Sequence, residues 1–375
     1  MIKGLDLQLL FGPGVPVPAP RAVIDALQGV KINENSGDTQ SGFELMFALE
    51  KDSPLSTLFL LAGGGALPIL RVALVATISG TAMPLINGVV TNTDLSPGAG
   101  GQPAMLSVKG KDLTAAMTKI DFSGTPYPAM PPAARVALIL AKYAWLGVIP
   151  QVIPSLEGPP LPTDKIPRHK GTDLAYILAL AEEAGYTFFM KPGPAPATSF
   201  AYWGPEVRIG AVQPALTAES GFSTNTEQLS FTFDKDGLEI PVVYIQQRES
   251  KAPIPIPIPS SIPFHPPIGA VPPLPPTITR LTDTAHLHPY EAVVRGFAAA
   301  ARRADPVTGT GTIDVLRYGR VLRARSLVGV RGAGPAFDGV HYVQSVTHDL
   351  SRGKYKQSFT LKRSGLLPTR PSVPA

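Results

Sequence analysis

The sequence predicts a mainly β protein of the α+β class, with two related β-modules, a small α/β insert and a proline-rich strap. Proline (42 residues) and glycine (36 residues) together exceed a fifth of the 375 residues, so turns and extended segments should dominate over helix. A hydrophobic content of 44% indicates a folded chain. Several segments alternate apolar and polar residues, and one phrase occurs near each end of the chain.

The repeated phrase covers residues 88–108 and 343–363, at an offset of 255 residues (343 minus 88). The matching residues are Asp94-Leu95-Ser96 with Asp349-Leu350-Ser351, Gly98 with Gly353, and Leu106 with Leu361. Each copy is predicted to form a strand, a polar turn and a returning strand. Two related β-modules are the expectation, and a chance match of a few residues is the alternative.

The first 107 residues are predicted to be all β. Phe43–Leu49 and Ile69–Ile78 alternate with the period of two that is typical of strands, and residues 84–88 lead into the first hairpin. The apolar stretch from Leu55 to Ile78 is interrupted by three glycines, a proline and Arg71. It is therefore predicted to be a loop and a strand, and no membrane segment is expected.

Residues 108–204 change period and are predicted to form an α/β insert. A helix is expected in Pro131–Leu146, which begins with proline and precedes Gly147. A second helix is expected in Thr172–Ala184, with Thr172 as N-cap and Gly185 as C-terminal stop. A short strand should follow in Tyr186–Met190.

The strap is Pro253–Pro276, which has 11 prolines in 24 residues. Such a run favours polyproline II at about 3.1 Å per residue, or about 75 Å if fully extended. Its isoleucines would be costly to leave in water, so the strap is expected to lie on a partner or on its own domain. A helix is expected at His288–Ala304, followed by an Arg-rich β stretch at Val315–Leu327 and a final strand.

The net charge of +5 is unevenly distributed, and charged residues make up only 16% of the chain. From Leu281 onward there are 14 Lys and Arg against 6 Asp and Glu. A basic last quarter suits nucleic acid, an acidic protein partner or a positively charged lumen. The low overall charge suggests that other protein covers much of the surface.

The basic candidates for an interface or a lumen lining are Arg317, Arg320, Arg323, Arg325 and Arg331. Arg323 and Arg325 are two residues apart and are expected on one face of a strand. A solvated strand face is the alternative. Sequence-specific nucleic-acid recognition is not expected, because no DNA-binding or RNA-binding motif accompanies the charges.

Catalytic motifs are absent from the sequence, and no cofactor is expected. The chain has no cysteine, which excludes thiolate metal sites. A weak metal candidate remains in His286, His288 and Asp283, whose imidazoles would share a face of an extended segment. His348, beside Asp349, is expected to be a structural residue of the second hairpin.

Three segments carry a resemblance to a known family: PLINGVVTNTDLS at residue 84, TDLAYILALAEEAGYTFF at residue 172 and FDGVHYVQSVTHDLSRGKYKQSFTLKR at residue 337. In this order the chain resembles the late control gene D family of phage tails and the hub portion of VgrG spike proteins. The resemblance implies two tube-like β-barrel domains, at 1–107 and at 205–250 with 306–366. It leaves 108–204 as the insert, 251–305 as strap and helix, and 367–375 as a flexible tail.

The resemblance also implies a function. In this family three chains form a pseudo-sixfold ring that adapts a threefold spike to a hexameric inner tube. The expected partners are two further copies, a separate spike protein with an OB-fold and a β-helix, the inner tube protein, and baseplate wedge or LysM-type adaptor proteins. Assembly in the bacterial cytoplasm into an injection particle or virion tail is expected, without enzymatic activity. A polyanion-binding module and a cell-wall hydrolase are the alternatives, and phage tail versus protein-delivering system stays open.

Overall fold

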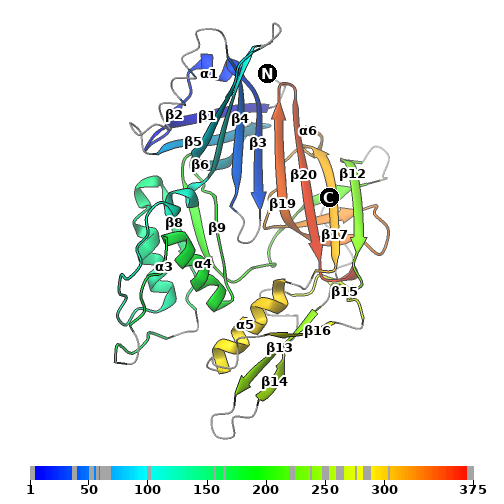
Figure 1. Cartoon of the computed structure of the whole chain (residues 1–375). Helices are drawn as coiled ribbons and strands as arrows, with labels where there is room; N and C mark the ends of the chain where they lie inside the picture. The colour runs from blue at the N-terminus through cyan, green and yellow to red at the C-terminus, as the bar shows by residue number, and fades with distance from the viewer. Residues whose placement is uncertain are drawn as a thin grey trace.

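A computed structural model describes residues 5–35, 40–49, 55, 59, 69–98, 103–155, 158–163, 166–218, 224–236, 239–246, 253–258, 266–274, 277–281, 289–302 and 305–369. Thirteen strands of this described part form one large sheet, which combines strands from the N-terminal and the C-terminal parts of the chain. The insert and the strap form small sheets of their own (Figure 1). The predicted mainly β fold class is confirmed.

The first module contains the N-terminal strands of the large sheet and one short helix. Their apolar sides enclose a core that includes Leu45, Phe47 and Leu74, and Phe59 stacks on Phe47 from a connecting segment. The elements are β1 (Leu5–Pro13), β2 (Val17–Pro18), α1 (Arg21–Ala26), β3 (Leu27–Asn35), β4 (Gly42–Leu49), β5 (Leu70–Ile78), β6 (Thr81–Ser96) and β7 (Ala104–Asp112). The two strands predicted from alternation are β4 and β5.

The second module contains the C-terminal strands of the same sheet. Its core includes Leu216, Val343 and Phe359, which point away from solvent by strand alternation. The elements are β11 (Val212–Thr217), β12 (Thr226–Phe233), β17 (Val307–Asp314), α6 (Val315–Tyr318), β18 (Leu327–Arg331), β19 (Gly339–Ser351) and β20 (Lys354–Arg363).

The two modules share one strand order. In space the first reads β3-β4-β7-β6-β5-β1 and the second reads β12-β17-β20-β19-β18-β11. Each strand also has the same rank along the chain in its module, so β6 corresponds to β19 and β3 to β12. Four of the five matching pairs are antiparallel in both modules; only β5 with β1 is antiparallel where β18 with β11 is parallel. The predicted internal repeat is a duplicated module.

The register refines the repeat. In each hairpin the last residue pair before the turn is formed by a serine of the first strand, Ser96 with Met105 in β6–β7 and Ser351 with Lys354 in β19–β20. The offset of 255 residues therefore holds for β6 and β19. The returning strand is out of step, because seven residues lie between Ser96 and Ala104 and only two between Ser351 and Lys354. Leu106 therefore corresponds to Tyr355, and the predicted match with Leu361 is wrong.

An aromatic ring packs over a glycine on a neighbouring strand at the same place in both modules. In the first module, Phe43 lies opposite Gly110; in the second, Gly311 lies opposite Phe359. A Cβ added at Gly110 would clash with the Phe43 ring, and one added at Gly311 would lie 2.6 Å from the Phe359 ring. Each module thus has one aromatic ring and one glycine at this pair of positions, with the strand that supplies the ring exchanged.

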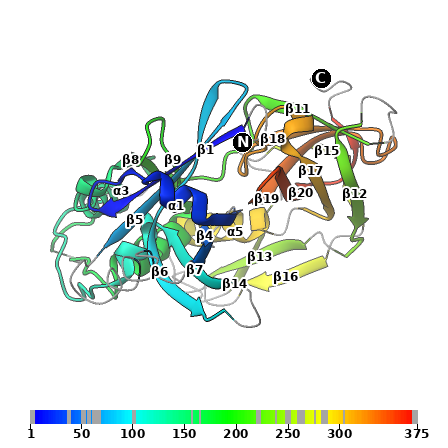
Figure 2. The same ribbon diagram turned by 90° about the horizontal axis from the view of Figure 1, so that it is seen from above.

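Strand pairing joins the two modules into one sheet. Residues 345–351 of β19 pair antiparallel with residues 35–29 of β3. We call this pairing the in-chain joint. Figures 1 and 2 show the first module and the insert on one side of it and the second module on the other.

The insert lies beside the first module and has its own core around Trp203 and Ile177. Thr172 caps helix α4 as predicted, and Gly185 ends it with a φ of 67°. The insert elements are η1 (Leu113–Thr118), α3 (Pro132–Ala141), η2 (Ala144–Leu146), β8 (Val148–Val152), α4 (Asp173–Ala184), β9 (Thr187–Pro192) and β10 (Ser199–Gly204). Strand β7 runs on to Asp112, past the predicted module end at 107.

The strap corrects one prediction. Pro253–Pro257 forms strand β14, not polyproline II, and pairs with β13. Isoleucines and prolines alternate along β14. The isoleucines direct their N–H groups towards β13, and the prolines, which have no N–H, face the open edge. The remaining elements are β13 (Glu239–Gln246), β15 (Gly269–Val271), β16 (Thr277–Leu281), α5 (Pro289–Arg302) and β21 (Leu366–Pro368). Because β21 pairs with β15, the start of the predicted flexible tail is ordered.

Candidate functional site

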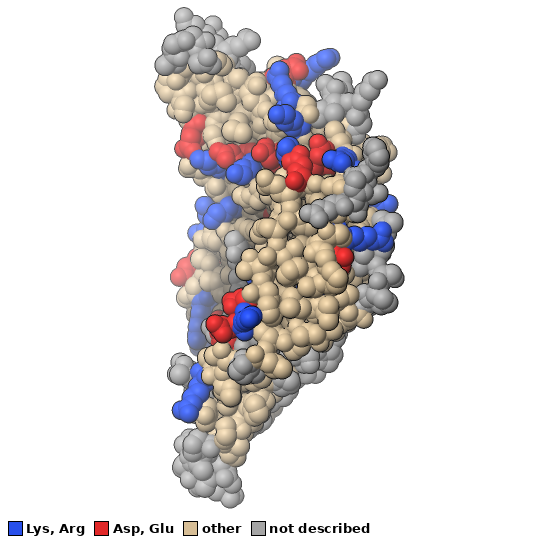
Figure 3. All heavy atoms as spheres, turned by 90° about the vertical axis from the view of Figure 1, so that its right-hand side faces the viewer, with Lys and Arg blue, Asp and Glu red and all other residues tan. Residues whose placement is uncertain are grey.

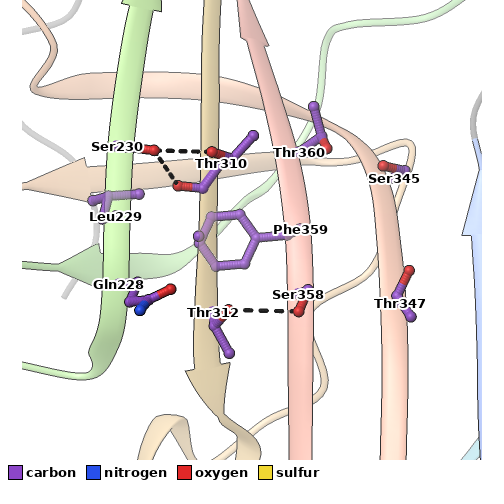
Figure 4. Close-up of a pocket in the computed structure, with 11 residues that line it drawn as sticks. Gln228, Leu229, Ser230, Thr310, Thr312, Ser345, Thr347, Ser358, Phe359 and Thr360 are labelled. Atoms are coloured by element: carbon purple, nitrogen blue, oxygen red, sulfur yellow. Dashed lines mark hydrogen bonds between the residues drawn. The ribbon is translucent and has the colours of Figure 1, made fainter.

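The second module presents a shallow, uncharged groove on one face of its sheet. Alternate residues of four neighbouring strands, β12, β17, β20 and β19, supply the lining (Figure 4). The hollow measures about 640 Å³. Its polar lining residues are Gln228, Ser230, Thr310, Thr312, Ser345, Thr347, Ser358 and Thr360.

Hydroxyl groups of this groove bond to one another across the strands. The Ser230 hydroxyl lies 2.9 Å from the Thr310 hydroxyl, and those of Thr312 and Ser358 are 3.5 Å apart. No residue that lines the groove is ionisable. The surface therefore offers hydrogen-bonding groups without fixed charge, and it would hold neither a polyanion nor a polycation strongly.

A row of alternating charges, which we call the charged belt, crosses the same sheet face nearer the hairpin turns. From β17 to β7 the cross-strand neighbours are Asp314, Lys356, Asp349, Lys31, Glu44 and Lys109. Acidic residues flank it: Lys356 Nζ lies 2.8 Å from Glu227 Oε2, and Lys109 Nζ lies 2.9 Å from Asp94 Oδ2. Figure 3 shows charged side chains of both signs in a band across one side of the molecule.

The charged belt passes from one module to the other without interruption. Asp349 of β19 lies opposite Lys31 of β3 at the in-chain joint. The hydrogen bond that Lys356 donates to the Glu227 carboxylate raises the pKa of Lys356, and the charges of Asp314 and Asp349 add to the effect. Because neighbouring charges alternate in sign, the belt creates no large field of one sign. Groove and belt together form one continuous face across both modules.

Behind this face, the in-chain joint holds a buried polar cluster. His348 Nε2 lies 3.8 Å from Glu34 Oε2, and His348 Nδ1 lies 2.8 Å from the Tyr355 hydroxyl. The guanidinium of Arg325 donates to the carbonyl of Asn35 and lies 3.9 Å from Glu34 Oε1. Arg323 donates to the carbonyl of Pro84 at 2.7 Å. The loop of the second module thus holds two strands of the first.

Burial and charge set the protonation of this cluster. Burial alone would raise the pKa of Glu34, but the contact with His348 and the charges of Arg323 and Arg325 hold it below its usual value. Burial lowers the pKa of His348, although Glu34 opposes this shift. At neutral pH, Glu34 is therefore charged and His348 is neutral.

The structure corrects the predicted strand at Arg323 and Arg325. Residues 315–318 form helix α6, and both arginines lie in the loop between α6 and β18. Arg325 has a φ of 58°, in the left-handed region and far from the extended backbone of a regular strand. Both side chains bind the chain's own first module. Arg317 and Arg320 are exposed and Arg331 is half-buried, and their roles at an interface or lumen stay predictions.

The predicted metal candidates Asp283, His286 and His288 lie outside the described residues. Within the described ranges, no three His, Asp or Glu side chains come together in a way that could hold a metal ion. In that same part of the chain, no helix has both the length and the apolar character needed to cross a membrane.

Glu34 was missed as a functional residue, although its position carries a signal. It follows Val30 and Ile32 at intervals of two and so falls on the buried side of β3. A carboxylate on an apolar strand face needs a partner. His348, predicted as a structural hairpin residue, is that partner.

We expect Glu34→Gln to lower the free energy of unfolding by about 2 kcal/mol, the order of the cost of leaving a buried polar group without its partner. The substitution keeps the size of the side chain but leaves Arg325 buried without a counter-charge. Urea unfolding at pH 7 measures the loss. Glu44→Gln, on a half-exposed belt position, is the matched control and should change stability by less than about 0.5 kcal/mol. Equal losses for both variants would contradict a stabilising role of the cluster.

Comparisons with solved structures place this architecture among phage tail proteins. A tail protein from Neisseria meningitidis MC58 superposes with a TM-score of 0.63 at 14% identity, covering 97% of this chain and 98% of that one. The 43 kDa tail protein of prophage MuSo2 from Shewanella oneidensis gives a TM-score of 0.62 at 13% identity, covering 96% and 99%.

A chain of the Francisella PdpA–VgrG complex matches with a TM-score of 0.62 at 9% identity. All of the present chain is covered, but only 60% of the Francisella chain. No protein-family model matches the sequence, and no curated protein does. At these identities the likeness shows a shared fold.

Proposed function

We propose that this protein is a structural hub of a phage tail baseplate or of a contractile injection system. The duplicated module carries the proposal, because one chain with two equivalent modules can place six of them around a ring of three chains. The shared fold with tail proteins and with a chain of a VgrG complex supports it. Such a ring adapts a threefold spike to a hexameric inner tube.

The chemistry of the continuous sheet face suits this role. A ring around a passage needs a lining that does not retain what moves through it, and the groove is uncharged. The charged belt is balanced in sign along its length. Arg323 and Arg325 are occupied within the chain, which removes two of five arginines from a polyanion site. The role is structural and non-enzymatic.

The partners that follow from this function are two further copies, a spike protein, the inner tube protein and baseplate wedge or LysM-type adaptor proteins. The spike is expected to be a separate polypeptide with an OB-fold and a β-helix. Assembly takes place in the bacterial cytoplasm, and the protein then belongs to the particle. Both a DNA-delivering tail and a protein-delivering system fit this description.

The oligomeric state tests the proposal. We expect light scattering coupled to gel filtration to give three times the chain mass of 39.5 kDa. Negative-stain electron microscopy of that fraction should show rings with six similar lobes. A protein that stays monomeric over a wide concentration range, both alone and with its inner tube protein, would contradict the trimeric hub.

A further inference from the structure

Within the described part of the chain, two open strand edges of the large sheet correspond to the two edges that pair in the in-chain joint. Strand β12 pairs only with β17, so its other edge is open. Strand β6 pairs with β5 only as far as Val89, which leaves one side of residues 90–96 open. In the second module the corresponding side of β19 is occupied by β3, at the in-chain joint.

The open edge of β12 corresponds to the edge that β3 uses in the in-chain joint. Ile32 of β3 pairs with Phe43 of β4, which pairs with Gly110 of β7. Gly110 is five residues after Met105, the β7 residue of the last pair before the hairpin turn. In the second module, Phe359 of β20 is likewise five residues after Lys354, the residue of the last pair before the turn. Phe359 pairs with Gly311 of β17, which pairs with Leu229 of β12. Leu229 therefore occupies the position of Ile32. By the same count, Ser230 corresponds to Asn33 and Phe231 to Glu34.

Exposure of apolar residues marks both open edges. At the in-chain joint, Leu350 is 4% exposed and Ile32 is 1% exposed. Their counterparts differ: Leu95 is 44% exposed, and Leu229 is only partly buried. Phe231, beside Leu229, is also partly buried and stacks on Phe337 at 5.0 Å. These are the side chains that an equivalent joint would cover.

We propose that β12 of one copy pairs with residues 90–96 of β6 in a second copy, in the register of the in-chain joint. This inter-copy joint rests on the proposed ring and names how its members meet. In the in-chain joint Thr347 pairs with Asn33 and Asp349 pairs with Lys31. The corresponding residues of the inter-copy joint are Asn92 opposite Ser230 and Asp94 opposite Gln228. Leu95, Leu229 and Phe231 then pack between the two copies.

The inter-copy joint differs chemically from the in-chain joint. Phe231 takes the position of Glu34 and Thr93 that of His348, so the inter-copy joint has no counterpart of the buried carboxylate that pairs with Arg325. On the other side of the sheet, Gln228 replaces Lys31 opposite the aspartate. Association should therefore depend mainly on apolar burial and backbone pairing, and little on salt.

Paired cysteines test the register directly, because the chain has no cysteine of its own. The test variant is Asn92→Cys with Ser230→Cys, and both residues are exposed. The control is Asn33→Cys with Thr347→Cys, whose side chains are 3.1 Å apart within one chain. After mild oxidation, we expect the test variant to run as linked chains on a non-reducing gel and the control to stay at single-chain mass.

A surface substitution gives a second readout. Leu95→Asp should raise the fraction of monomer in light scattering, because it places a charge in the apolar part of the inter-copy joint. Leu138→Asp is the matched control: this leucine of α3 is 51% exposed but far in sequence from either edge. Equal effects of the two substitutions would overturn the proposed packing.

The outcomes separate the joint from the hub. A wild-type trimer whose Asn92→Cys/Ser230→Cys variant stays at single-chain mass after oxidation overturns the inter-copy joint and leaves the hub standing. Cross-linked chains in an assembly of another number support the joint and contradict the trimer. Efficient cross-linking of Asn92→Cys with Thr232→Cys instead would overturn the register.

Discussion

Replacing Arg363 with methionine is expected to destabilise the protein by about 4 kcal/mol or more, since each orphaned buried acceptor costs about 1–3 kcal/mol. The side chain is fully buried at the end of β20. It donates to the carbonyls of Gly365 at 2.6 Å, Asp338 at 2.9 Å and Phe337 at 3.2 Å, and also to Ala336. Methionine fills similar space but removes the donor; Ala336 keeps the Leu367 N–H at 3.0 Å, so the other three carbonyls account for the loss.

Urea unfolding followed by circular dichroism measures this loss. Arg363→Lys should fall between wild type and Arg363→Met, because an ammonium group cannot reach four acceptors in the geometry of a guanidinium. Lys354→Met, at an exposed position of the same strand, should change stability by less than about 0.5 kcal/mol. An Arg363→Met variant as stable as the Lys354→Met control would refute the role of this arginine.

Local patterns predicted the elements whose cause is local. Alternation in residues 43–49 requires only that one side of a strand be buried, and the N-cap of α4 requires only Thr172 and the following turn. The duplication was visible because both hairpins keep an Asp-Leu-Ser before the turn. A longer turn in the first copy shifted the returning strand, and a comparison without gaps could not follow that shift.

The errors share a physical origin in partners that lie outside the segment itself. Composition favoured polyproline II at residues 253–257, but β13 supplied an edge that alternate isoleucines could pair with. Spacing favoured a strand at Arg323 and Arg325, but carbonyls and a carboxylate of the first module hold them in a loop. The partners of these two arginines lie about 240 to 290 residues away in the chain, beyond any local pattern.

The in-chain joint and the proposed inter-copy joint show how one module can serve two purposes. The joint within a chain forms whenever the chain folds, so it can contain the buried ion pair of Glu34 with Arg325, beside the neutral imidazole of His348. A joint between copies must form from separate, solvated surfaces. Burying an ion pair there would carry a desolvation cost at each association, which apolar residues avoid.

Acid is expected to destabilise the fold well above the pH at which carboxylates titrate, and His341 is the clearest cause. Its side chain is fully buried, and its Nε2 has no hydrogen-bond partner among the described residues. Burial and, to a lesser degree, the charge of Arg363 lower the pKa of His341 from 6.5 to about 3. The folded protein keeps this imidazole neutral, whereas the unfolded chain binds a proton below pH 6.5.

Stability is therefore lost as the pH falls from about 6.5 towards 3, at about 1.4 kcal/mol per pH unit for this residue. His348, whose pKa burial also lowers, acts in the same direction. His341→Leu should reduce the loss in the free energy of unfolding between pH 6.5 and pH 5 by about 2 kcal/mol, because the variant no longer has this proton-binding group. Urea unfolding at a series of pH values measures the slope, with Lys354→Met as a control that keeps it. If the leucine variant retained the full slope, His341 could not be the buried neutral imidazole whose protonation favours the unfolded chain.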